Sequence, residues 1–156
     1  MPAIETLTIL IDLRPSDPDL YAKRAKLHKS RHDSALVYQD LLQIRKIQSD
    51  HPDIPLLYQY VRECIVAYEN RASEFELRKD LPSAITVLSS ALSLDPEDWM
   101  MLLKRGILYA RIGREELAMS DINQYLADPA RDVSRDIEGK RELAKICISR
   151  AQKFQE

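Results

Sequence analysis

Apolar side chains recur along most of the chain at the three- and four-residue spacing of one helix face. The spacing is clearest in two sets, Tyr68–Ala72–Phe75 and Leu102–Gly106–Tyr109, each of which places a small residue before an aromatic side chain. Prolines between the apolar segments interrupt the pattern, because proline cannot continue a helix. The pattern predicts eight helices and an all-α fold, with helices over residues 3–13, 18–31, 34–49, 54–79, 81–93, 97–112, 115–127 and 133–154.

The two sets are related by an internal repeat, which is the first feature to seek in a helical sequence. Arg105-Gly106 repeats Arg71-Ala72, and Arg71-Ala72 repeats Arg24-Ala25 after a longer step. One constant offset relates both halves of each unit, so a single insertion at 52–64 accounts for the longer step. A last step of the shorter length takes Leu41 to Leu7, which makes residues 3–15 the second helix of a further unit.

These residues resemble the tetratricopeptide repeat family, whose unit of about 34 residues has the length of the shorter step and forms two antiparallel helices. Residues 18–51 depart from the family pattern, with His28 at the tyrosine position, and Tyr125 replaces a small residue in the last repeat. The resemblance implies a right-handed solenoid of antiparallel helix pairs in a single domain covering residues 1–156. Its expected parts are a partial repeat at 1–17, a degenerate repeat at 18–51, an insertion at 52–64 that extends a helix, repeats at 65–98 and 99–132, and a capping helix at 133–156.

The resemblance also implies a concave groove lined by the first helix of each pair. The side chains expected in this groove are Lys23, Lys26, Asn70, Ser73, Met100, Leu103, Lys104, Ile107 and Arg111. Met100, Leu103 and Ile107 form an apolar strip suited to a helix or an extended peptide. In an alternative interpretation, the inserted or C-terminal helix covers part of this groove.

Some family members use the groove as a clamp for the acidic C-terminal tail of a chaperone. Asn70 and Lys104 match positions of that clamp, whereas Ala22 and Met100 stand where side-chain donors are required. Alanine and methionine cannot donate a hydrogen bond to a carboxylate. The sequence therefore favours an apolar peptide over an acidic tail, and the chaperone adaptor stays an alternative.

Two irregularities offer further docking sites. The insertion extends its helix and would present Leu57, Tyr60 and Val61 beyond the repeat, either as a spur that docks a partner or as a cover for the degenerate repeat at 18–51. The partial repeat at residues 3–15 leaves an apolar helix face, which is a simple cap, an interface with another chain, or the mark of a longer repeat protein. The C-terminal helix is expected to cap the last repeat, the alternative being a partner-binding tail.

Composition limits the function. The formal net charge is −2 with both signs interspersed, which argues against nucleic acid and anionic membranes as partners. We expect no signal peptide, the sequence has no membrane-spanning apolar run, and Cys64 and Cys147 lack the paired spacing that would indicate a disulfide framework or a zinc site. A cytoplasmic protein is expected. His28 and His32 are read as a solvated pair on a helix, and His51 as a surface loop residue.

No phosphate-binding loop, metal-ligand spacing or nucleophile motif occurs, so we expect no enzymatic activity, cofactor or metal. The sequence predicts a protein-interaction scaffold that binds protein or peptide partners as a subunit of a multi-protein complex. Family members serve in ciliary, cytoskeletal and trafficking complexes, which gives these locations by association only. A regulatory subunit of an enzyme complex is the other alternative.

Overall fold

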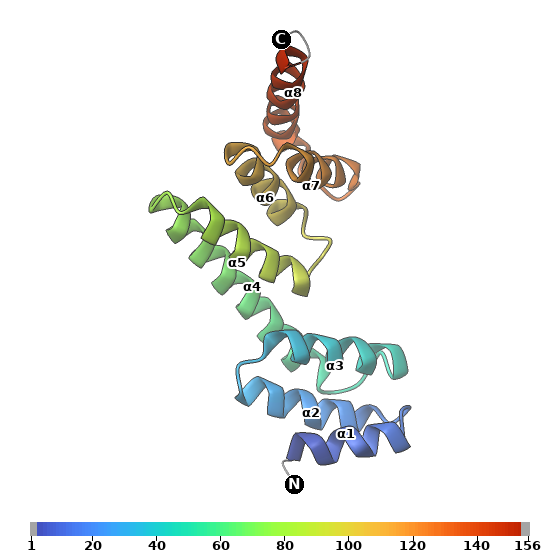
Figure 1. Ribbon diagram of the computed structural model, residues 1–156. Coiled ribbons are helices and arrows are strands. Elements are labelled where there is room, and N and C mark those ends of the chain that lie inside the picture. Colours follow the sequence, from blue (N-terminus) through green and yellow to red (C-terminus); the bar gives the residue numbers. More distant parts are fainter. Residues whose placement is uncertain (1–2, 154–156) are drawn as a thin grey trace. The chain divides into compact units, whose positions relative to one another are not determined.

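The computed structural model describes residues 3–153, which form eight α-helices and one short 3-10 helix and contain no strand (Figure 1). The helices are α1 (Ala3–Leu13), α2 (Pro18–Ser30), α3 (Ser34–Ile47), α4 (Ile54–Leu77), α5 (Leu81–Leu94), α6 (Trp99–Arg111), α7 (Glu115–Ala127), η1 (Val133–Arg135) and α8 (Asp136–Lys153). The predicted all-α fold is confirmed. Predicted helix ends agree to within two residues except in the last helix, whose first turn is η1 and whose predicted end, Phe154, lies outside the described residues.

Four of the helices begin directly after an aspartate. The carboxylates of Asp17, Asp33, Asp80 and Asp98 each accept a hydrogen bond of 3.0–3.2 Å from a backbone N–H in the first turn of α2, α3, α5 or α6. Such a cap satisfies an N–H that has no partner within the helix and stabilises it by about 1 kcal/mol. The start of each of these helices is therefore encoded locally.

The turns inside the helix pairs recur along the chain at the same spacing as the sequence repeat. Among the described residues, three adopt a positive φ: His32 at 59°, Lys79 at 59° and Gly113 at 76°. They follow α2, α4 and α6, and their separations equal the longer and the shorter step of the sequence repeat. A left-handed residue directly after a helix is a common way to end it, and glycine is the residue that does so without strain. His32, Lys79 and Gly113 therefore occupy equivalent turns of the repeat.

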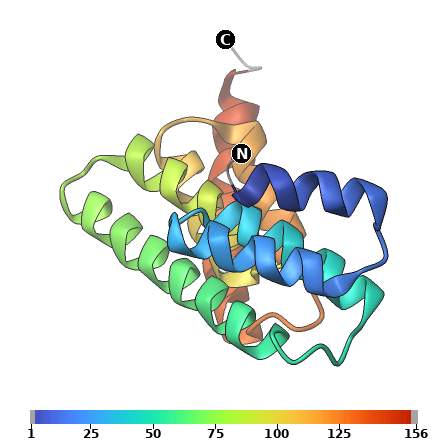
Figure 2. The same ribbon diagram turned by 90° about the horizontal axis from the view of Figure 1, so that it is seen from below.

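The chain divides into two compact units, and the first contains α1, α2, α3 and α4 as far as Ala67. The helices α2 and α3 form an antiparallel pair, and α1 lies beside α2 (Figure 2). Apolar side chains that are almost fully buried hold this unit together, namely Ala25, Val37, Leu41, Ile44, Leu57 and Val61. Their spacing on each helix is the apolar period of the sequence.

The second unit runs from Tyr68 and contains the rest of α4, together with α5, α6, α7, η1 and α8. From Tyr68 onward α4 lies alongside α5, α6 pairs with α7, and α8 packs against both α6 and α7 (Figures 1 and 2). The buried core of α6 and α7 includes Leu102, Leu108, Ala118, Ile122 and Tyr125. The prediction of antiparallel helix pairs is confirmed within this unit.

Gly106 allows the close approach of α6 and α7. A Cβ atom at this position would lie 2.7 Å from Cγ1 of Ile122 and 3.3 Å from the carbonyl oxygen of Ala118. Ordinary Cβ contacts are essentially never as short as the first of these distances. The glycine inside α6 is therefore required by packing and is not a weak point of the helix.

Candidate functional site

The structure places the residues expected in the groove on two separate surfaces. Ser73 on α4 and most of the α6 set line two adjoining pockets of the second unit, of about 170 Å³ and 480 Å³, which share Glu76 and Lys104. We call this surface the unit 2 groove. Its lining residues are Ser73, Glu76, Leu77, Leu103, Lys104, Ile107, Leu108, Arg111, Arg135 and Glu138. Lys23 and Lys26 belong to α2 in the first unit and line a different pocket.

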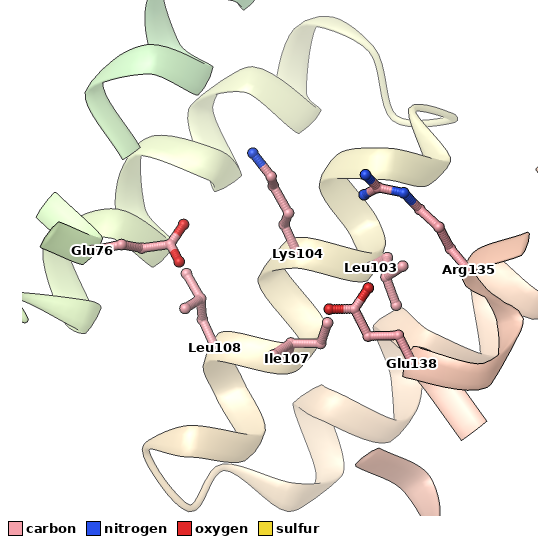
Figure 3. Close-up of a pocket in the computed structure, with 7 residues that line it drawn as sticks. All are labelled: Glu76, Leu103, Lys104, Ile107, Leu108, Arg135 and Glu138. Carbon is pink, nitrogen blue, oxygen red and sulfur yellow. The ribbon is translucent and has the colours of Figure 1, made fainter. Parts of the chain in front are cut away.

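The smaller pocket of the unit 2 groove has an apolar floor and a charged rim. Helix α6 presents Leu103, Ile107 and Leu108 along the floor (Figure 3). Glu76 approaches from α4 on one side, and Arg135 and Glu138 approach from η1 and α8 on the other (Figure 3). An apolar floor with a few polar groups at its edge is the arrangement that binding sites commonly use.

Two cations of the groove, Lys104 and Arg111, already have carboxylate partners within the protein, whereas Arg135 donates to the sulfur of Met100. Nζ of Lys104 lies 3.1 Å from Oε1 of Glu69, and Nη1 of Arg111 lies 3.9 Å from Oε2 of Glu76. These pairs are partly exposed, so each contributes little to stability. A carboxylate ligand would nevertheless have to compete with Glu69 and Glu76 for both cations.

Three of the expected groove residues differ from the prediction in their exposure or in their position. Leu103 is 1% exposed and belongs mainly to the core, so only its edge reaches the pocket. Met100 is half-buried, and its sulfur accepts a hydrogen bond of 2.8 Å from Nη1 of Arg135. Asn70 on α4 does not line the groove. The apolar strip is therefore narrower than predicted, because α8 follows on from η1 beside α6 and Arg135 covers part of Met100.

The insertion does not form the spur that was one of its two interpretations. Leu57 is 0% exposed and Val61 is 2% exposed, so neither side chain is available to a partner. Tyr60 is half-buried, with Nζ of Lys29 5.3 Å from the centre of its ring. The alternative, that these residues serve as a cover within the first unit, agrees with this burial. Docking through Leu57 and Val61 would require them to leave the core.

Buried charges form a structural network that the sequence did not predict. Arg24 donates to both carboxylate oxygens of Asp40, at 3.1 and 2.6 Å, and also to the hydroxyl of Thr8. The bond to Asp40 raises the pKa of Arg24 above its ordinary value. Asp40 is 2% exposed, and burying a carboxylate is tolerated only with such a partner. The sequence repeats Arg24 as Arg105 and Asp40 as Asp121, but it contains no local pattern that would pair the arginine with the aspartate.

The C-terminal helix is fixed by charged groups as well as by apolar contact. Nε of Arg131 lies 2.9 Å from Oδ1 of Asp136, and the bond lowers the pKa of that carboxyl below its ordinary value. Farther along, Arg150 and Lys153 bond Glu115 at the start of α7 and lower its pKa. The sequence predicted a cap for the last repeat but not these pairs.

The histidines lie elsewhere than predicted. Helix α2 ends at Ser30, so His32 is a turn residue and does not share a helix with His28, which is buried. His51 was predicted to lie on the surface, but it is 4% exposed. Its Nε2 lies 3.0 Å from Oδ1 of Asp19, and its Nδ1 accepts a bond from the N–H of Asp53. His51 therefore ties the loop before α4 to the start of α2.

Comparison with known proteins does not assign a family. No protein-family model matches the chain. No curated protein matches it either. Among solved structures, the chain is similar to one described as "Crystal structure of MamA", with a TM-score of 0.41 and 14% identity over 99% of this chain and 90% of that chain. No helix among residues 3–153 combines the length and apolar character needed to cross a membrane.

Proposed function

We propose that the chain is a non-enzymatic protein-interaction module of the tetratricopeptide type, which holds a peptide segment of a protein partner in the unit 2 groove. The observation that carries this proposal is the half-buried Ile107 on the floor of the pocket, above the buried Leu103 and Leu108 and between charged side chains from α4, η1 and α8. Beside it, Leu77 is 86% exposed at the edge of the larger pocket. A large exposed apolar side chain next to a hollow is typical of an interaction surface.

The chemistry of the groove selects a partner with an apolar anchor. Lys104 and Arg111 are paired with glutamates, so a purely acidic tail gains little from them. An apolar side chain of the partner would contact Leu77 and Ile107 without breaking either pair. The helices hold these groups in place before binding, so little conformational entropy is lost. In this proposal the chain serves as a subunit or adaptor in a larger assembly in the cytoplasm.

The test is affinity purification of the full chain with cross-linking of its lysines, followed by one pair of variants. We expect cross-links from the partner to Lys79 or Lys104, near the groove. Leu77→Asp should abolish capture of the cross-linked partner, because it places a charge at the apolar edge. Leu13→Asp is the matched control, since Leu13 is also a highly exposed leucine, at 73%, and lies on α1 outside the groove.

Retention of the partner by Leu77→Asp would contradict the proposal. Binding of an acidic peptide that ends in Glu-Glu-Val-Asp, weakened by Lys104→Ala, would instead favour a chaperone adaptor. Cross-links confined to a catalytic subunit would favour a regulatory role for the module.

A further inference from the structure

A second open groove lies in the first unit, between α1 and α2. It has a volume of about 580 Å³ and is lined by Ala3, Thr6, Leu7, Lys23, Lys26 and Leu27. We call it the α1–α2 groove. Its floor is apolar, and its two lysines come from the same face of α2. Lys26 pairs with Asp53 at 2.7 Å, whereas Lys23 is exposed and has no ion pair among the described residues.

The protein contains a second version of this groove. Thr8, Arg24 and Asp40 form a hydrogen-bonded set, and Ser89, Arg105 and Asp121 form another with the same spacing along the chain. Adding the longer and the shorter repeat step to the residue number of each member of the first set gives the residue number of its counterpart in the second set. Helices α1, α2 and α3 of the first unit therefore correspond to α5, α6 and α7 of the second.

In the second unit α4 fills the α5 side of the corresponding groove, whereas Ile107 and Leu108, the counterparts of Lys26 and Leu27, still line the unit 2 groove. Helix α4 lies alongside α5 from Tyr68 onward, and Glu69 of α4 forms an ion pair with Lys104 of α6 (Figure 1). Lys104 is the counterpart of Lys23. On α5 the counterparts of Ala3 and Leu7 are Ala84 and Leu88, both 0% exposed.

In the first unit the same positions are uncovered. Ala3 is exposed and Leu7 only half-buried, although their counterparts in the second unit are completely buried. The difference has a simple cause, since the second unit has a helix in this groove and the first unit has none among the described residues. The internal comparison thus indicates both the shape and the charge of the missing occupant.

We propose that the α1–α2 groove binds an amphipathic helix supplied by a partner protein, with the residue spacing seen in α4 from Tyr68 to Phe75. Such a helix presents a small buried residue, as at Ala72, and an aromatic residue three places later, as at Phe75. A carboxylate three places before the small residue, as at Glu69, pairs with Lys23. This surface is separate from the unit 2 groove and does not depend on the function proposed for it.

An anionic membrane surface is a poorer occupant than a helix. Acidic and basic residues are equal in number over residues 1–67, and Asp53 already neutralises Lys26. Electrostatic attachment to a membrane requires a cluster of cations, which two lysines do not provide. A single unpaired lysine beside an apolar floor instead fits one carboxylate on an apolar helix face.

The test uses the helix that fills the corresponding groove. The probe is a synthetic peptide of residues 65–80, stapled through positions 70 and 74 of α4. A staple is needed because an isolated helix of this length is marginal in water. Binding to the full 18.0 kDa chain is followed by NMR, with expected shifts at Leu7, Lys23 and Leu27.

A charge exchange makes the test specific. Lys23→Glu should weaken the peptide roughly threefold to tenfold, as expected for a partly exposed ion pair. A peptide that carries Glu69→Lys should recover most of that loss on the Lys23→Glu chain. Lys46→Glu is the matched control, because Lys46 is an exposed lysine of α3 outside the groove and its variant should bind normally.

Three results would overturn the proposal. One is the absence of saturable binding up to about 1 mM peptide, a concentration at which even weak specific complexes form. Another is a set of shifts confined to Ser73 and Lys104, which would mean that the peptide displaces α4 in the second unit. The third is a dimer of the free chain in sedimentation that Lys23→Glu dissociates, which would assign the groove to a second copy.

Leu77→Asp should leave peptide binding unchanged, so failure of the unit 2 groove and failure of the α1–α2 groove are distinguishable.

Discussion

Arg105 binds Asp121 through two nitrogens, with Nε 2.7 Å from Oδ2 and Nη2 2.8 Å from Oδ1. Asp121 is 5% exposed, and this bond raises the pKa of Arg105 above its ordinary value. This bidentate contact forms only when α6 and α7 pack in a single register relative to each other. A buried charged pair is a poor source of stability but strongly penalises any arrangement that leaves one member unpaired.

We expect Asp121→Asn to lower the free energy of unfolding by about 2–4 kcal/mol, because it leaves the Arg105 charge without a carboxylate. Urea denaturation followed by circular dichroism measures this. Glu142→Gln is the control, since it breaks an exposed pair with Lys145 and should change stability by less than about 0.5 kcal/mol. Equal effects of the two variants would show that the Arg105 pair has no special role.

Gly106→Ala should destabilise the protein by about 1–2 kcal/mol. The added methyl group clashes with the buried side chain of Ile122, and this outweighs the roughly 1 kcal/mol that alanine gains in a helix. Gly139→Ala is a graded comparison, because a Cβ there comes no closer than 3.2 Å to any neighbour. Thermal unfolding should rank Gly106→Ala as the more harmful change, and the reverse order would contradict the packing argument.

Lys79→Gly should stabilise the protein by about 0.5–1 kcal/mol. Lys79 has a φ of 59°, which costs an L-residue about 1–2 kcal/mol, and the added flexibility of glycine in the unfolded chain offsets part of the gain. Arg78→Gly is the control, because Arg78 has no positive φ and the change should be neutral or unfavourable. A melting temperature that falls in Lys79→Gly would mean that the lysine side chain contributes more than its backbone strain costs.

Acid should loosen the attachment of α8. The pKa values of Asp136 and Glu115 are lowered in the folded protein by bonds to Arg131 and to Arg150 and Lys153. A lowered folded pKa means that the unfolded chain binds more protons, so stability falls as the pH drops through about 4 and below. Melting curves from pH 7 to pH 3 should show a deficit of Asp136→Asn at neutral pH that shrinks as the pH falls below about 4. A deficit independent of pH would exclude the charge of Asp136 as its cause.

Helix positions and turns could be predicted from the sequence because their causes are local. Aspartate caps, apolar periods and the turn residues His32, Lys79 and Gly113 all act within a few residues. The burial of His51 could not be predicted, since its partner Asp19 is distant in the sequence and meets it only in the folded chain.

The groove was predicted only in part for the same reason. Positions on α6 follow from the repeat, and Lys104, Ile107 and Arg111 do line pockets of the second unit, while their role in binding a partner stays a prediction. Leu103 faces inward, and Arg135 reaches Met100 from a later part of the chain. Contacts of that kind depend on how η1 and α8 pack against α6. The apolar period of α6 itself gives no information on that packing.

Each of the three glycines in the 156 residues has a fixed place: Gly106 between α6 and α7, Gly139 where α8 meets them, and Gly113 in a turn. None remains to loosen the backbone around the unit 2 groove. A ligand of that groove meets a surface that is already ordered, so its binding should not be coupled to folding. In calorimetry, the heat-capacity change of binding should match the value expected from the buried contact area. It should not show the larger negative value that accompanies coupled folding and binding.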